Sequence, residues 1–241
     1  GWARRRQGLA IPAGRVAVAD SPAHILRQTF ALSEGRFTGL HGEIALRSDG
    51  RRSTLRIFHE GREIVATLLP DSLSAVGIDV ALAWDAGFVV RLSYDGVEDG
   101  PALRSAIWCA LQVAVEAAAE LENAPEAVMG VLAVAAAAAE ALAVPAELRR
   151  RIDADHALWQ LPAWRTTEAG RFVSTAEIAE LLARRGALCV AGPERRGTSR
   201  DERVVLALSA REREWLAAVL DRDLPLVPYA KALTVGIDAG A

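Results

Sequence analysis

The sequence is poor in several residues that particular functions require. Lysine plus arginine amounts to 28, and Lys231 is the only lysine, which leaves 27 arginines. No lysine stands in a G-x-x-x-x-G-K-[ST] phosphate loop, and no G-x-G-x-x-G motif follows a predicted strand. We therefore expect the chain to bind no nucleotide through either device and to carry no cofactor.

Cysteine is almost absent as well. Cys109 and Cys189 are the only two, and each lies in an apolar stretch where a small buried side chain is expected. Two distant cysteines cannot form a zinc site alone, and nothing favours a disulfide, so we expect a reducing, cytoplasmic location. No apolar run follows the arginines at positions 4 to 6, as a signal peptide would require. Because Gly1 stands in place of an initiator methionine, we expect a piece of a longer protein.

Motifs for hydrolytic and metal-dependent catalysis are also missing. There is no H-E-x-x-H and no G-x-S-x-G. His41 and Glu43 would share a face of a strand, and Asp153 and His156 a face of a helix, so either pair could serve acid–base chemistry or metal binding. Neither pair has a third ligand at a recognisable spacing, and we predict no metal site. An enzyme or ligand-binding domain built from such scattered His, Asp and Glu residues is our first alternative function.

The charge balance gives little attraction to nucleic acid. The net charge is −3 and apolar residues make up 51%, which indicates a folded protein without a global pull toward phosphates or anionic lipid. The arginines nevertheless form short clusters, and we name Arg195 and Arg196, in a polar loop, as candidate interaction residues. Arginine-mediated nucleic-acid binding is our second alternative function. We do not expect it, because the clusters are spread along the chain.

An alanine-rich run from Pro101 to Val144 divides two segments of mixed helix and strand character. Its first half repeats apolar residues at spacings of three and four, which predicts an amphipathic helix. Trp108 falls on the polar row of that helix, with Arg104 and Gln112, and is our main candidate for contact with a protein partner. The second half predicts a nearly buried helix. Its many alanines and Glu140 argue against a membrane span, so we expect no membrane partner.

The segment before this run is predicted to be rich in strands. Residues 15–20 (RVAVAD) alternate like a strand, and a short helix is expected at residues 23–31. Residues 36–94 predict an antiparallel β-meander of four or five strands, with a hairpin at Glu60-Gly61. The alanine-rich helices would cover its apolar face. We expect an α+β fold in which residues 1–145 form this layered unit and residues 146–241 form a small α/β domain.

The second unit carries the two clearest local signals. Ser174 with Glu177, and Ser209 with Glu212, both fit the capping box that begins a helix. Strands are predicted at residues 187–191, 203–208 and 224–227. Because these strands alternate with the capped helices, parallel neighbours in a small sheet are favoured.

Several short stretches occur in a recognisable order. They are Gly39-Leu40-His41-Gly42-Glu43-Ile44, Glu60-Gly61-Arg62, Leu161-Pro162, Gly170-Arg171-Phe172-Val173-Ser174, Ala187-Leu188-Cys189-Val190 and Asp201-Glu202-Arg203-Val204-Val205-Leu206. In the order of these stretches and in their pattern of apolar and polar residues, residues 36–230 resemble the middle, or transducer, region of bacterial Hsp90-like proteins of the GHKL superfamily. The resemblance implies a non-catalytic module that relays ATP-driven changes from an ATP site in a separate N-terminal domain.

The function that we predict follows from this resemblance and from the missing catalytic motifs. We expect a protein-interaction or transducer module of a larger cytoplasmic multidomain protein, chaperone-like in role. Its partner would be another protein or another domain of the parent chain, and self-association into a homo-oligomer is left open.

Overall fold

The computed structural model of the chain describes residues 16–49, 51–73, 75–121, 123–144, 155–195 and 204–228. These residues form two compact units. The first holds the described residues up to Ala114 and residues 140–144, and the second holds the described residues of 115–139 and those from 155 onward. Both units contain helices and strands, which confirms the predicted α+β class. Residues 115–139, predicted to accompany the first sheet, belong to the second unit.

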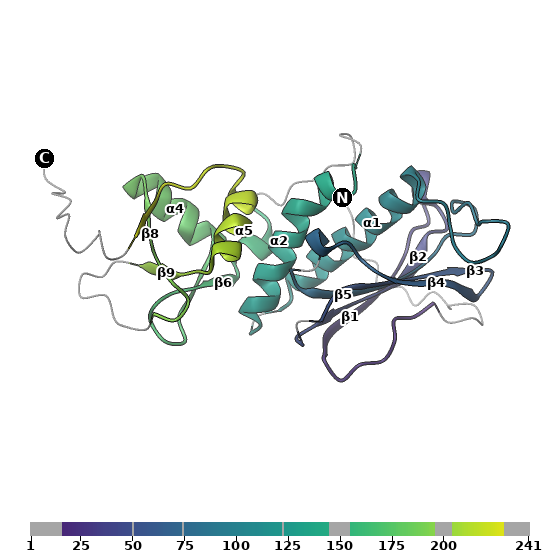
Figure 1. Ribbon diagram of the computed structural model, residues 1–241, viewed down its shortest axis with the longest axis horizontal. Helices are drawn as coiled ribbons and strands as arrows, with labels where there is room; N and C mark the ends of the chain where they lie inside the picture. Colours follow the sequence, from purple (N-terminus) through teal and green to yellow (C-terminus); the bar gives the residue numbers. More distant parts are fainter. Residues whose placement is uncertain are drawn as a thin grey trace, which may run out of the picture. The chain divides into compact units, whose positions relative to one another are not determined.

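A five-stranded sheet is the centre of the first unit (Figure 1). Its strands are β1 (His24–Ala31), β2 (His41–Arg47), β3 (Thr54–His59), β4 (Arg62–Leu68) and β5 (Gly77–Ala83). The order across the sheet is β1-β2-β5-β3-β4. Most neighbours are antiparallel, but β3 and β5 are parallel. The predicted meander is therefore wrong in its connectivity, because the last strand lies between β2 and β3 and not at an edge.

The predicted helix at residues 23–31 is wrong. Those residues form the edge strand β1, which pairs with β2 from His24 to Ala31. Isolated helices of this length are marginal in water, so pairing with a long neighbouring strand decides the conformation. A strand was predicted at residues 15–20, and this is wrong for the described residues 16–20, which belong to no strand of the sheet.

The alanine-rich run forms the two predicted helices, α1 (Pro101–Ala118) and α2 (Pro125–Ala141). Helix α1 covers one face of the five-stranded sheet (Figure 1), and the apolar side chains of β2 and β5 that point to this face are buried, among them Ile44, Leu46, Ile78 and Leu82. Among the described residues, no helix has the length and hydropathy to cross a membrane. Two 3₁₀ turns, η1 (Gly35–Phe37) and η2 (Asp71–Leu73), complete this part of the chain.

The second unit alternates strands and helices as predicted. In chain order, its elements after α2 are α3 (Ala157–Gln160), β6 (Pro162–Arg165), β7 (Phe172–Ser174), α4 (Thr175–Arg185), β8 (Leu188–Ala191), β9 (Val205–Ala207), α5 (Ala210–Leu220) and β10 (Leu226–Pro228). Strands β10, β8 and β9 form a parallel sheet in that order. Strands β6 and β7 form an antiparallel pair, and a bridge between Thr166 and Leu206 links this pair to β9.

Both capping boxes are present, and they give the first testable prediction. The Ser174 side chain accepts a hydrogen bond from the backbone N–H of Glu177 at 3.1 Å, and the Glu177 carboxylate accepts one from the backbone N–H of Ser174 at 2.7 Å. Ser209 and Glu212 make the same pair at the start of α5. Replacing Ser174 with alanine leaves an N–H unpaired, so we expect the free energy of unfolding of this unit to fall by about 1 kcal/mol.

Urea denaturation followed by circular dichroism measures this loss, and Ser209→Ala is expected to cost a similar amount. Glu180→Gln is the control. Its side chain is exposed and makes only a surface pair with Arg184, worth under about 0.5 kcal/mol. Equal midpoints for Ser174→Ala and Glu180→Gln would contradict the prediction.

Candidate functional site

The sheet of the first unit presents a polar face on the side opposite to α1. Side chains alternate along each strand, and the register places Ala45 and Thr54 on the same face as Asp79. The residues that we call the polar face are Arg27 of β1, Glu43, Ala45 and Arg47 of β2, Thr54, Arg56 and Phe58 of β3, and Asp79, Ala81 and Ala83 of β5. This face combines buried charges with small side chains, which is unusual because charged residues are rarely buried unless they are paired.

Asp79, in the central strand, is the first of two buried carboxylates of this face. It is 4% exposed. Its Oδ2 lies 3.0 Å from His24 Nε2 and 3.5 Å from Arg47 Nη1, and its Oδ1 accepts a hydrogen bond of 2.6 Å from the Thr54 hydroxyl. Three strands thus contribute partners to one buried charge, which satisfies it as burial demands.

This cluster has the residue types of a hydrolytic triad but not the connectivity. In a triad, the hydroxyl bonds to the imidazole and the imidazole bonds to the carboxylate. Here the Thr54 hydroxyl and the His24 imidazole both bond to Asp79. The remaining ring nitrogen of His24, Nδ1, is buried and makes no hydrogen bond within the described part of the chain. The arrangement therefore fixes the positions of three strands and does not activate a nucleophile.

Glu43 is the second buried carboxylate of the polar face. Arg27 donates from Nε to its Oε1 at 3.1 Å and from Nη2 to its Oε2 at 2.9 Å, a bidentate pair. The backbone N–H of Val18 donates to the same Oε2 at 3.0 Å. Arg27 also donates to Asp20 at 2.7 Å. The pKa of Arg27 is raised above its usual value, first by the hydrogen bond to Glu43 and then by the one to Asp20.

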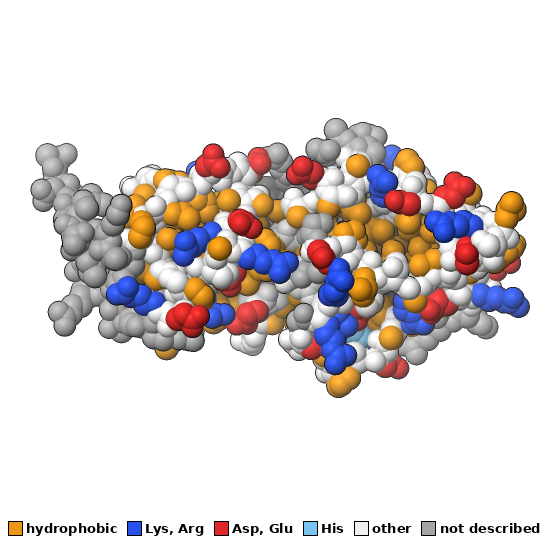
Figure 2. Space-filling view, in the orientation of Figure 1, with side chains coloured by type: hydrophobic (Ala, Val, Ile, Leu, Met, Phe, Trp, Pro, Cys, Tyr) orange, Lys and Arg blue, Asp and Glu red, His pale blue; other side chains and the backbone are white. Residues whose placement is uncertain are grey.

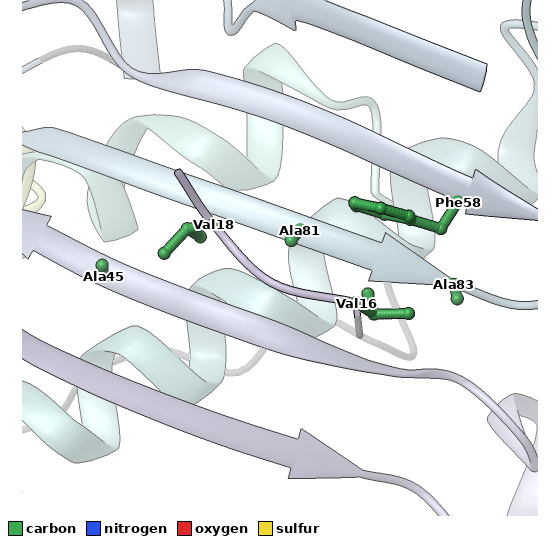
Figure 3. Close-up of a cluster of buried hydrophobic side chains, with 6 residues drawn as sticks. All are labelled: Val16, Val18, Ala45, Phe58, Ala81 and Ala83. Atoms are coloured by element: carbon green, nitrogen blue, oxygen red, sulfur yellow. The ribbon is translucent and has the colours of Figure 1, made fainter. Parts of the chain in front are cut away.

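Residues 16–20, which we call the crossing segment, lie in extended form over the polar face (Figure 3). Val16 and Val18 are each 4% exposed. They pack in one apolar cluster against Ala45, Phe58, Ala81 and Ala83. The small alanine side chains leave room for the valines, so the crossing segment lies close above the sheet.

Arg56 binds the backbone of the crossing segment from the side of β3. Its Nη1 donates to the carbonyl oxygen of Ala17 at 2.7 Å. The same guanidinium pairs with Glu63 and lies 5.3 Å from the centre of the Phe58 ring, so its direction is fixed. Arg56 and Glu43 therefore supply one donor and one acceptor to consecutive backbone groups. The polar face binds an extended backbone through side chains, without a strand ladder.

The candidate interaction residues named from the sequence are not part of this site. Trp108 is 3% exposed, so the prediction that it presents its ring on an exposed polar row is wrong. Arg104 and Gln112 of the same row are partly exposed and Glu116 is exposed, so the burial of Trp108 is local to its position in the row. Arg195 is exposed, and its role as an interaction residue stays a prediction. Arg196 lies outside the described residues.

The scattered titratable residues each have a local role. Glu43 is bonded as described above, and the ring of His41 contacts the carbonyl of Gly39 at 3.0 Å. His156 belongs to the second unit, where it caps α3 by accepting from the N–H of Leu158 and lies 3.6 Å from Glu116. Asp153 lies outside the described residues. Within the part of the chain that the structure describes, no group of three or more His, Cys, Asp or Glu could bind a metal ion.

The environment of Cys109 disfavours a nucleophilic thiolate. Cys109 is buried in α1, and burial raises the pKa of its thiol to about 11, against the opposing effect of Arg36. A thiol with such a pKa stays protonated at neutral pH, whereas thiolate is the reactive form. Cys189 is partly buried in β8.

Sequence reasoning missed Arg27, Arg56 and Asp79. For Asp79, a signal was present: a lone carboxylate stands inside the apolar run IDVALA, where a buried charge implies a partner. The partners themselves come from β1, β2 and β3, and no local pattern marks them.

Comparison with known proteins gives no family assignment, since no protein-family model and no curated protein sequence matches the chain. On the surface shown in Figure 2, basic and acidic side chains alternate, without an extended area of either sign. The functional assignment therefore depends on the chemistry of the polar face.

Proposed function

We propose that this chain is a non-catalytic protein-interaction or transducer module of a larger protein, similar in role to the middle region of Hsp90-like proteins. Its working contact is the one between the crossing segment and the polar face. The observation that carries the proposal is how the segment is bound. Val18 donates to Glu43 and Ala17 accepts from Arg56, so side chains bind the segment and no ladder hydrogen bonds have to break for its release.

The charges of the polar face remain paired when the crossing segment leaves. Glu43 keeps its two hydrogen bonds to Arg27, and Arg56 keeps Glu63. The bonds of Asp79 to His24 and Thr54 do not involve the segment at all. Release of the crossing segment therefore leaves no unpaired charge on the polar face. Because no charge has to be left unpaired, the contact can open and close at low cost.

The free energy that holds residues 16–20 on the polar face is the difference between two gains and one cost. Burial of the side chains of Val16 and Val18 contributes about 3–6 kcal/mol. The two hydrogen bonds between backbone and charged side chains contribute about 3–6 kcal/mol together. Ordering the backbone of residues 16–20 costs about 5–10 kcal/mol. The gains and the cost are of similar size, so the segment can open while the sheet stays folded.

Native-state hydrogen exchange of the full chain tests this proposal. We expect the amide of Val18 to exchange by local opening, with little dependence on denaturant, while the amides of β5 exchange only by unfolding of the sheet. Exchange of residues 16–20 only together with β5 would show that the segment is a fixed part of the core, and would refute a transducing role for it.

A matched pair of variants sharpens the measurement. Val18→Ala removes two methyl groups, a loss of about 1.5 kcal/mol, and should accelerate exchange of residues 16–20 roughly tenfold. Val89→Ala removes the same atoms from a side chain that is 58% exposed and should leave this exchange unchanged.

A further inference from the structure

We infer that the polar face recognises an extended segment of a partner protein that carries β-branched residues at alternate positions and an acidic residue two positions later, and that this partner displaces residues 16–20. The inference rests on the proposed function and names the partner that it leaves open. The crossing segment, Val16-Ala17-Val18-Ala19-Asp20, is the template for the recognised pattern.

The two valine positions set the apolar part of the pattern. In Figure 3, Val16 lies toward Ala83 and Phe58, and Val18 lies toward Ala45 and Ala81. Successive side chains of an extended chain point to opposite sides, so residues two apart enter the face together. Larger side chains would meet the sheet backbone beneath the alanines, whereas alanine or serine would leave the apolar space unfilled.

The backbone contacts fix the direction of the bound segment without reading its sequence. Arg56 donates to the carbonyl of the residue between the two valines, and Glu43 accepts from the N–H of the second valine. A segment of reversed direction would place a carbonyl against the Glu43 carboxylate. The side chains between and directly after the valines are not selected, since Ala17 is partly exposed and Ala19 is exposed.

The acidic position is read by Arg27. Its Nη1 donates to Asp20 at 2.7 Å, while its other donors bind Glu43. The Asp20 side chain is 93% exposed, so this pair selects weakly, by a few-fold in affinity. A nucleic acid does not fit the same face, because its phosphates would approach the buried carboxylate of Glu43.

The crossing segment competes with a partner because it is tethered to the face. A tethered ligand acts at a high effective concentration, and an incoming segment binds only the fraction of molecules in which the face is vacant. Weakening residues 16–20 within the full chain therefore strengthens binding of an added peptide.

Fluorescence anisotropy with a labelled peptide of residues 14–22 (GRVAVADSP) tests the inference. The double variant Val16→Ser, Val18→Ser of the full chain should bind this peptide at least tenfold more tightly than the wild type does. A peptide with serine at both valine positions should lose at least tenfold in affinity, and one with asparagine in place of aspartate about two- to fivefold. Equal binding of a scrambled peptide would overturn the inference.

Two arginine variants, each made in the double-variant background, separate specific from general effects. Arg56→Met should weaken peptide binding about tenfold, because the donor to the peptide carbonyl is lost. Arg62→Met, which removes the charge of an exposed arginine on β4, should leave it unchanged. Equal losses for the two would show that only charge matters and would overturn the inference.

A fallback variant and two further binding tests cover the other possible results. If the double variant loses its cooperative unfolding transition, Val18→Ala alone provides the same comparison, with an expected gain of about tenfold that equals its effect on local opening. If a single-stranded oligonucleotide bound more tightly than the peptide, the occupant of the polar face would be nucleic acid and the inference would be overturned. If light scattering showed a heterodimer of variant and wild type, the occupant would be a second copy of this chain, which would also overturn it. Local opening in hydrogen exchange without peptide binding would refute this inference and leave the proposed function standing.

Discussion

Replacing Asp79 with alanine is expected to lower the free energy of unfolding by about 3–5 kcal/mol, because Arg47 then keeps only Asp49 as an ion-pair partner among the described residues and the buried groups of His24 and Thr54 lose theirs. The guanidinium of Arg47 is 9% exposed and the imidazole of His24 is 4% exposed, so neither can turn to solvent without moving its strand. Thr54 loses its acceptor as well. Chemical denaturation monitored by tryptophan fluorescence measures the loss.

Asp71→Ala is the matched control for this substitution. The Asp71 side chain is 77% exposed and pairs with Arg52 at the surface, so its removal should cost under about 1 kcal/mol. A second comparison combines Asp79→Ala with Thr54→Val. Since the two side chains share a hydrogen bond, the double variant should lose less than the sum of the single losses. A cost below 1 kcal/mol for Asp79→Ala would contradict the role assigned to this cluster.

Replacing Gly42 with alanine is expected to be comparably damaging, for a steric reason. A Cβ at this position would lie 2.0 Å from the backbone oxygen of Ala81 in the neighbouring strand. Backbone cannot move aside as a flexible side chain can, so β2 and β5 must separate. We expect a loss of about 3 kcal/mol or more, at the upper end of the cost of overpacking. The unfolding midpoint of the purified variant provides the measurement.

Gly100→Ala is the control in the same unit. A Cβ at Gly100 would meet no atom within 4 Å, and the residue precedes the first turn of α1. We expect its stability to stay within about 0.5 kcal/mol of the parent chain. Similar midpoints for the two glycine variants would show that the close approach of β2 to β5 is not a constraint.

Features encoded locally were predictable from the sequence. The capping boxes at Ser174 and Ser209 and the turn at Glu60-Gly61 each need only a few neighbouring residues, and all are present. The alanine-rich helices follow from propensity and from apolar spacing. The placement of Trp108 failed for a related reason: helical periodicity shows which residues share a row, but it does not show which rows are covered.

The polar face was not predictable, because its groups meet only through strand pairing. Asp79 and Thr54 are brought together by the parallel register of β3 and β5, which no hairpin pattern implies. The conformation of residues 23–31 depends in the same way on pairing with β2, and the pattern within residues 23–31 alone does not show that pairing. Alternation at residues 15–20 predicted a strand, but residues 16–20 pair with no strand, and their backbone is bound instead by the side chains of Glu43 and Arg56.

The central position of β5 has a consequence for how the sheet assembles. Strands β1 and β2, and strands β3 and β4, are hairpins that can form locally, whereas β5 joins both and is the last strand of the sheet in the chain. Such distant pairing is slow, since loop closure precedes any gain in contacts. A slip of β5 by one residue would turn Asp79 toward the apolar face. Because His24 comes from one hairpin and Thr54 from the other, this single carboxylate selects the correct alignment of the two halves during folding.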